Sequence, residues 1–138
     1  MNIEQGLVAY LRAHSTVGLI FRNATSPQSY RIYSEFLPEQ PDYPALRYAR
    51  VSTAPLLTLS GPIGYNQARL QIDVWDKTGA GCRAAADAVR SALDGLRDDI
   101  GGASIGHAYI DAFAAQSELE GDRTDYRMTM DLIVTLTE

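Results

Sequence analysis

The sequence has 138 residues, of which 46% are hydrophobic and 21% are charged, and its formal net charge is -5. These values are typical of a folded protein with one hydrophobic core, so we expect a single domain that spans residues 1–138. The acidic balance argues against a nucleic-acid-binding surface, because neutralising phosphates requires clustered Lys and Arg side chains. The only cysteine, Cys82, excludes an internal disulfide and the common cysteine-based zinc sites.

The start of the sequence has neither the basic segment nor the apolar run of a signal peptide. No stretch approaches the roughly 18 consecutive apolar residues that a membrane-spanning helix requires. We therefore expect a protein that is made and kept in the reducing cytoplasm and has no membrane partner.

The first predicted element is a helix that begins after Asn2. Asn2 and Gln5 have the spacing of a capping box, in which each side chain accepts a hydrogen bond from the other residue's backbone. The side chains that recur at helical spacing are Ile3, Leu7, Tyr10 or Leu11, and His14. Residues 15–29 are less regular, and Ser26-Pro27 predicts a loop there.

Five segments have the composition of β-strands. Residues 30–36 predict a short strand, and the prolines that follow it exclude regular structure between them. Residues 45–53 predict a second strand. Residues 68–75 alternate between apolar and mostly polar side chains, which is typical of an antiparallel sheet covered on one face. Residues 105–113 and 125–136 predict two more strands, joined by an acidic turn that contains a glycine.

A second helix is predicted over residues 81–98, with one apolar and one charged face. The apolar stripe consists of Cys82, Ala85 or Ala86, Val89, Leu93 and Leu96. The charged face, a solvated or lateral contact face, consists of Arg83, Asp87, Arg90, Asp94 and Arg97. We expect Gly101-Gly102 to end this helix.

The order of the elements is helix, three strands, helix, two strands. It predicts an α+β fold in which an antiparallel sheet of four to five strands carries two helices on one face. The residues expected in the core are Leu70, Ile72, Val74, Val89, Leu93, Met130 and Leu132.

Residues 55–65 form a segment that is long and unusually apolar for a loop. We expect its prolines and glycines to prevent regular pairing, so that it is mobile in the isolated subunit and ordered by a partner. The candidate interface residues are Leu56, Leu57, Leu59, Ile63 and Tyr65. The alternative is that the segment folds back over the helices as ordinary core.

A glycine-rich run resembles the phosphate-binding turn of dinucleotide-binding folds. It consists of Gly79-Ala80-Gly81-Cys82-Arg83-Ala84. The strand before it alternates, whereas a buried parallel strand would be apolar throughout, and the expected acid after the next strand is missing. A flexible start of the second helix is the better interpretation.

Other candidate chemistry is equally weak. Cys82 and His107 could pair as nucleophile and base, but Cys82 lies on an apolar stripe, where a cysteine is usually inert. His14 and His107 are interpreted as packing or capping residues. Four acids lie close enough in the sequence to be considered as calcium ligands, and they are Glu118, Glu120, Asp122 and Asp125. Their spacing does not match that of an EF-hand loop. We therefore predict no catalytic residues, no metal and no cofactor.

Six stretches together carry a resemblance to a known family. They are Ile3–Leu11, Arg31–Tyr33, Tyr43–Tyr48, Ala68–Trp75, Ala84–Leu93 and Tyr126–Leu132. The most specific is R-x-Q-I-D-x-W over residues 69–75, followed by an alanine-rich helix. In these stretches and their order, the chain resembles the tail-completion, or tail-terminator, family of long-tailed bacteriophages and related particles. Residues 15–29 look longer than the family usually has.

The resemblance implies a structural virion protein, and no catalytic residues carry over from the family. It implies a subunit of a ring, expected to be a hexamer, that caps the head-proximal end of the tail tube and stops its growth. The implied location is the head–tail junction of the virion, and the implied partners are further copies of the chain, the tail tube protein and the head connector or completion protein. The candidate interface then contacts a neighbouring subunit or the tube.

DNA would pass through the ring without specific binding. Six copies at -5 each carry a formal charge of -30, which favours a lumen along which DNA can slide. Two alternatives stay open: a head-completion or adaptor ring protein of the connector, and, in a different class, a small-molecule-binding or enzymatic α+β domain.

Overall fold

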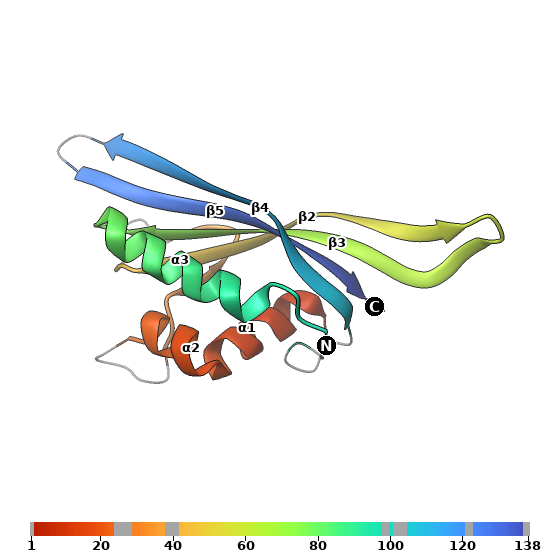
Figure 1. Ribbon diagram of the computed structural model, residues 1–138. Helices are drawn as coiled ribbons and strands as arrows, with labels where there is room; N and C mark the ends of the chain where they lie inside the picture. Colours follow the sequence, from red (N-terminus) through yellow and green to blue (C-terminus); the bar gives the residue numbers. More distant parts are fainter. Residues whose placement is uncertain are drawn as a thin grey trace.

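The structure is a computed structural model that describes residues 2–23, 29–37, 42–97, 100, 105–120 and 123–136. In this part of the chain, a five-stranded sheet carries three helices on one face (Figure 1). The strands are β1 (Ile32–Ser34), β2 (Ala45–Thr58), β3 (Gly61–Asp76), β4 (Ile105–Glu120) and β5 (Arg123–Leu136). The helices are α1 (Ile3–Ala13), α2 (Ser15–Phe21) and α3 (Gly79–Leu93). The α+β prediction is confirmed, with one helix more than the two predicted.

The strands lie side by side in the order β1-β2-β3-β5-β4. β2 with β3, β3 with β5, and β4 with β5 are antiparallel pairs, whereas β1 runs parallel to β2 with Ile32 opposite Leu46. The sheet is therefore mixed, and the prediction of a wholly antiparallel sheet is wrong at this edge. β1 ends after three residues because Glu35 adopts a left-handed conformation (φ 68°), which turns the chain.

α1 begins as predicted, because Asn2 and Gln5 form both hydrogen bonds of the capping box. The helix then packs its apolar side chains into the core. The Tyr10 hydroxyl donates a hydrogen bond to the Ala92 carbonyl at 3.0 Å. This bond connects α1 to α3, so the helices form one layer over the sheet.

α2 occupies the beginning of residues 15–29, where the sequence predicted irregular structure and a loop. The His14 ring caps this helix: its Nδ1 accepts hydrogen bonds from the backbone N–H groups of Thr16 and Val17, both at 3.3 Å. Histidine is not among the usual capping residues, so the start of α2 has no common sequence signal. Residues 24–28 lie outside the described part of the chain.

α3 ends at Leu93, earlier than the predicted end at residue 98. Gly95, which follows the cap, has a φ of +78°, a conformation that glycine adopts without strain. Gly95 therefore follows the helix where the sequence analysis expected Gly101-Gly102 to end it. The latter pair lies outside the described residues.

The core lies between the helices and one face of the sheet. All seven residues predicted for the core are buried, and they are Leu70, Ile72, Val74, Val89, Leu93, Met130 and Leu132. They belong to α3 and to the central strands β3 and β5, in one cluster. The alternation that was visible in the sequence thus identifies the buried face of the sheet correctly.

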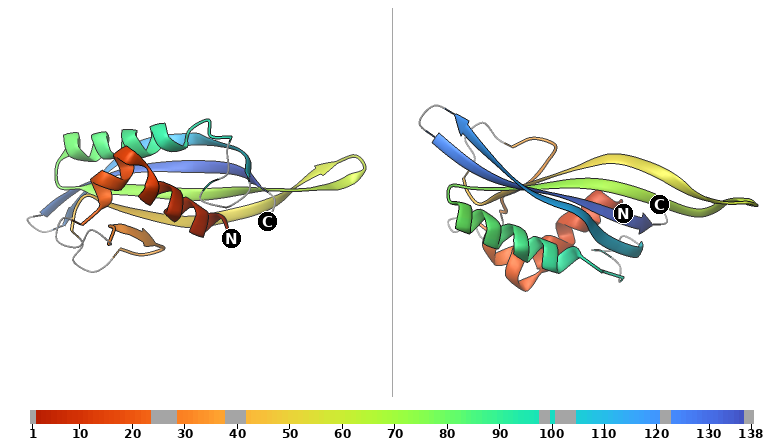
Figure 2. Two further views of the ribbon diagram at one scale, coloured as in Figure 1. Left: turned by 90° about the horizontal axis from the view of Figure 1, so that it is seen from below. Right: turned by 45° about the horizontal axis from the view of Figure 1, so that its top comes forward.

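β2 and β3 continue as a hairpin through residues 55–65, which the sequence analysis interpreted as an unpaired loop. Leu57 lies opposite Pro62 in this hairpin. Figure 2 shows that the hairpin projects from one end of the sheet, beyond the helices. We call residues 51–67 the β2–β3 arm.

The loop prediction was wrong because it counted proline and glycine as breakers without regard to position. β5 pairs with β3 only as far as Asn66, and β1 pairs with β2 only as far as Tyr48, so most of the arm has two strands. Each strand there has a free edge, where a proline removes no hydrogen bond of the ladder. A register shift lies next to Pro55, and bulges also accommodate proline.

Candidate functional site

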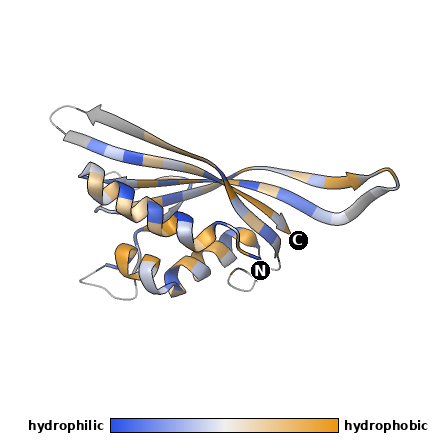
Figure 3. Ribbon diagram, in the orientation of Figure 1, coloured by the Kyte–Doolittle hydropathy of each residue, from blue (hydrophilic) through white to orange (hydrophobic). Residues whose placement is uncertain are grey.

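The β2–β3 arm is uncharged and apolar over a large part of its surface. Residues 51–67 include no charged side chain. Six large hydrophobic side chains are exposed in the described part of the chain, and the four that belong to the arm are Val51, Leu57, Leu59 and Tyr65. Figure 3 shows the hydrophobic end of β2 in the arm. Exposed apolar surface of this kind commonly marks an interaction site.

The structure exposes three of the five predicted interface residues and half-buries a fourth. Leu57 is 66% exposed, Leu59 and Tyr65 are also exposed, and Leu56 is half-buried. The Ile63 side chain lies outside the described part of the structure. Because Leu57 and Leu59 are exposed, the alternative of a segment folded back over the helices does not hold for them.

The sequence analysis missed Val51, which is 56% exposed and begins the arm. Residue 51 was assigned to an ordinary strand, so its exposure was not considered. The signal that could have found it is the uninterrupted run of uncharged residues from 51 to 68.

An ion pair anchors the base of the arm to the helix layer. Arg50 of β2 lies directly before the arm, and its Nε lies 2.7 Å from Oε1 of Glu4 in α1. Both side chains are less than one third exposed. The arm thus starts from a point that is fixed to α1, while its tip has no helix against it (Figure 1).

The sheet face opposite the helices carries a buried carboxylate. Asp73 of β3 is fully buried, forms an ion pair with Arg47, and accepts a hydrogen bond from the Thr129 hydroxyl at 2.7 Å. The Gln71 amide donates to the same carboxylate at 3.1 Å. The sequence predicted this polar face but not the burial of Asp73, since the partners come from three strands.

Two arginines flank Trp75 on that face. The guanidinium groups of Arg47 and Arg127 each lie 5.6 Å from the centre of the indole, a cation–π distance. Farther along the face, Arg69 pairs with Asp131 at 3.0 Å. On this face Arg47 and Arg69 are both paired with carboxylates, so these two side chains do not form a free cluster of cations for a nucleic acid.

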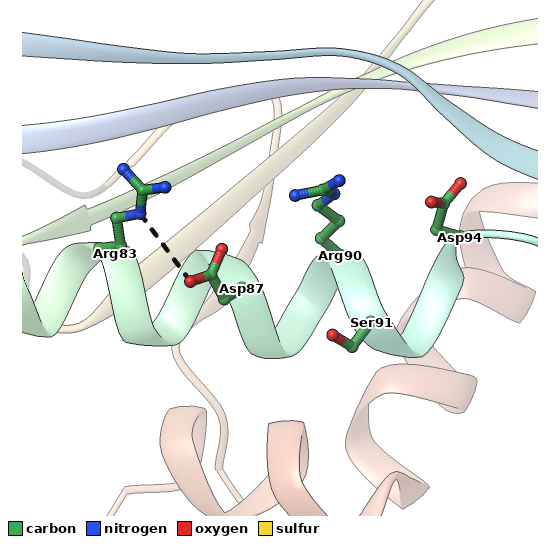
Figure 4. Close-up of a pocket in the computed structure, with 5 residues that line it drawn as sticks. All are labelled: Arg83, Asp87, Arg90, Ser91 and Asp94. Carbon is green, nitrogen blue, oxygen red and sulfur yellow. Dashed lines mark ion pairs between the residues drawn. The ribbon is translucent and has the colours of Figure 1, made fainter.

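The charged face of α3 borders an open hollow of about 690 Å³ (Figure 4). The residues that line it are Arg83, Asp87, Arg90, Ser91 and Asp94. The Asp94 carboxylate accepts a hydrogen bond from the Ile110 backbone at 2.8 Å, and the Arg90 guanidinium lies 5.0 Å from the Phe113 ring centre. These contacts hold β4 against α3, so at least these two side chains have a structural role.

The glycine-rich run at the start of α3 does not form a phosphate site. The preceding strand β3 is antiparallel to both of its neighbours, whereas a dinucleotide-binding fold needs parallel strands. Thr78 caps the helix by accepting from the Gly81 backbone at 3.1 Å. A Cβ on Gly81 would collide with the Asp76 carboxylate, so an acid already lies against this helix start. That acid would repel a phosphate.

Cys82 and His107 do not approach each other. The Cys82 thiol donates to the carbonyls of Val74 and Tyr126, each at 3.3 Å, and burial raises the pKa of this thiol. His107 lies opposite Thr135, nine residues along β5 from Tyr126, which corresponds to roughly 30 Å. Cys82 and His107 therefore do not form a nucleophile–base pair.

The described residues contain neither a cluster of metal-ligating side chains nor a helix that could span a membrane. They contain no group of three or more His, Cys, Asp or Glu side chains that could hold a metal ion. No helix among them is long and apolar enough to cross a bilayer. Of the four acids considered for calcium, the side chains of Glu118, Glu120 and Asp122 lie outside the description, and Asp125 is buried.

Comparison with known proteins identifies a family and a fold. Residues 5–136 match the family described as "Tail completion protein gp17". Among the solved structures that match is a chain described as "Virion of native gene transfer agent (GTA) particle", with a TM-score of 0.74 and 16% sequence identity. The match covers 99% of this chain and 95% of that chain. No curated protein matches significantly.

Proposed function

Because this chain belongs to the tail completion protein gp17 family, we propose that it forms a ring that caps the head-proximal end of a phage tail tube. The cap stops tube growth and presents a surface to the head connector. The chain is a structural tail-completion protein by family, and the proposed location is the head–tail junction of a virion. The observation that carries the proposal is the family match over nearly the whole chain.

The fold supports a role in a particle rather than in catalysis. The likeness to a gene transfer agent virion chain extends over 99% of the residues, so the chain contains the same fold almost without insertions. In the described part of the chain, Cys82 and His107 lie far apart, and no group of three or more His, Cys, Asp or Glu side chains could hold a metal ion. We therefore propose that the protein has no enzymatic activity.

The proposed ring is a hexamer with DNA in its lumen. Six copies with a formal charge of -5 each carry -30, which disfavours tight binding of a phosphate backbone. On the described part of the open sheet face, Arg47 pairs with Asp73 and Arg69 with Asp131. This pairing leaves these two arginines less available to hold DNA in place.

The β2–β3 arm is the proposed interface of the ring with a neighbouring subunit or with the tube. Its candidate residues are Leu56, Leu57, Leu59, Ile63 and Tyr65. A two-stranded hairpin is only marginally stable by itself in water. A partner that covers the exposed leucines lowers the free energy, because it removes their apolar surface from water. An arm without charge also lets subunits with equal net charge approach with little repulsion.

Electron microscopy of the purified protein mixed with tail tubes tests this function. The proposal predicts a cap at one end of each tube and tubes that stop growing once they are capped. Native mass spectrometry should give about 91 kDa, the mass of six copies of the 15.1 kDa chain. Binding to head connectors alone indicates the adaptor instead, and a protein that binds neither tubes nor connectors contradicts both structural functions.

A further inference from the structure

A small apolar groove lies at the end of the sheet farthest from the β2–β3 arm. Here β4 and β5 continue past the start of α3 and leave a cavity of about 200 Å³. Its lining includes Gly79 at the start of α3, Ala115 of β4, and Tyr126 and Met128 of β5. We call this cavity the α3–β4–β5 groove.

Small residues keep the groove open. Gly79 has no side chain, and a Cβ placed there would lie 3.5 Å from the Tyr126 ring, in ordinary contact. An alanine at this position would thus add a methyl group to the groove without a clash. Ala115 is exposed and contributes only a methyl group. An apolar cavity of about 150 Å³ holds a benzene molecule in another protein, so about 200 Å³ has room for a leucine side chain.

The arm and the groove cannot meet within one subunit. Gly61 at the tip of the arm and Asp76 beside the groove are the two ends of β3. Fifteen residues of strand separate them, which corresponds to roughly 50 Å. Figure 1 shows the tip of the arm and the start of α3 at opposite ends of the molecule. A contact between them therefore requires a second copy.

The charges also favour a second copy as the occupant. Each subunit carries a net charge of -5, so two copies repel each other on average. The arm has no charged residue, and the groove lining contains the arginines Arg83 and Arg127 but no acid. Arm and groove are thus surfaces through which acidic copies can touch without apposing carboxylates.

We propose that the tip of the β2–β3 arm, with Leu57 and Leu59, docks into the α3–β4–β5 groove of the next copy. This inference rests on the proposed ring and specifies its subunit contact. Because the two surfaces lie at opposite ends of the chain, the contact is head-to-tail, and head-to-tail contacts close into rings when the rotation between copies permits.

Disulfide trapping tests the contact. The variant combines Leu59→Cys with Ala115→Cys, and mild oxidation should link each copy to the next. A non-reducing gel should then show a ladder of covalent oligomers, from the dimer up to the number of subunits in the ring. The matched control combines Leu19→Cys with Ala115→Cys, because Leu19 on α2 is 66% exposed, like Leu57, but lies outside the arm. The control and the unaltered protein should give no ladder on a non-reducing gel.

The outcomes separate the contact from the ring itself. Rings in native mass spectra together with a ladder in the arm variant alone support the docking. Rings without that ladder, or an equal ladder in the Leu19 control, overturn the docking and leave the ring function standing. Absence of rings and of tube caps for the unaltered protein overturns both.

A groove-filling variant provides an independent measurement. Ala115→Leu should weaken ring association by about 10- to 100-fold, the loss expected when one leucine can no longer be buried. Ala114→Leu is the matched control, because Ala114 is the exposed neighbour on the same strand and does not line the groove. Equal association of the two variants, measured by analytical ultracentrifugation of folded protein, contradicts the docking.

Discussion

β2 and β3 lie in two different surroundings along their length. From Ala68 to Trp75, β3 has strands on both sides and α1 and α3 above it, and its inward side chains are buried. In the β2–β3 arm the same two strands extend beyond the helices and expose Leu57 and Leu59. The difference teaches that strand pairing continues beyond the core, while the leucines at the tip of the arm lack the helix layer that covers the inward side chains of the core.

This comparison assigns different roles to the two regions. Removing a side chain from the helix-covered region should lower the free energy of unfolding. Removing one from the arm should leave folding nearly unchanged and affect assembly. Four variants test the assignment, in order from the largest expected effect on stability to the smallest.

Leu93→Ala should have the largest effect. Leu93 of α3 is fully buried in the core cluster, so the substitution leaves a cavity and should lower the free energy of unfolding by about 2–5 kcal/mol. Chemical denaturation followed by circular dichroism measures this. A loss below about 1 kcal/mol would show that the helix packs less tightly than the structure indicates.

Asp73→Ala should cost about 1–3 kcal/mol, because it leaves Arg47 and Thr129 without their buried acceptor. The matched control is Asp111→Ala, which removes an ion pair with Arg69 in which both side chains are more than one third exposed. The control should change stability by less than about 1 kcal/mol. Equal losses in denaturant titrations would mean that the burial of Asp73 has no energetic consequence.

Replacing Leu57 and Leu59 together by serine should change the free energy of unfolding by no more than about 0.5 kcal/mol per site, since both side chains are exposed. Thermal unfolding of the monomer measures this, with Leu19→Ser as a control because Leu19 is as exposed as Leu57. A melting temperature that falls by many degrees would show that the arm is part of the folding core.

His107→Ala should have the smallest effect, and no effect on tube capping. His107 stacks on Tyr109 with ring centres 5.5 Å apart and has no thiol beside it. His14→Ala is the informative comparison, because it removes the cap of α2 and should cost about 1 kcal/mol in thermal unfolding. Loss of capping in a folded His107→Ala protein would reopen the case for catalysis.

The regular part of the fold could be predicted from the sequence. The alternation from Ala68 to Trp75 and the capping pattern of Asn2 with Gln5 depend on local spacing, and both predictions are confirmed. α2 could not be predicted, because the His14 ring caps it in place of a usual capping residue.

The candidate site could be predicted in part. The apolar residues of the arm were identified, but not their pairing, since a proline such as Pro55 is tolerated only where a strand has a free edge or a bulge. The free edge depends on how far β5 extends beside β3, which no local pattern reveals. The contact of Asp73 with Arg47 and Thr129 likewise depends on the register of three strands.

The most direct test of the account is the length of tail tubes assembled with the Leu57→Ser/Leu59→Ser protein. The unaltered protein should cap tubes in electron micrographs and hold their length constant. The variant should have the circular dichroism spectrum and monomer melting temperature of the unaltered protein, yet leave tube ends uncapped and growing. A variant that caps tubes as efficiently as the unaltered protein would contradict the claim that the β2–β3 arm is an assembly surface.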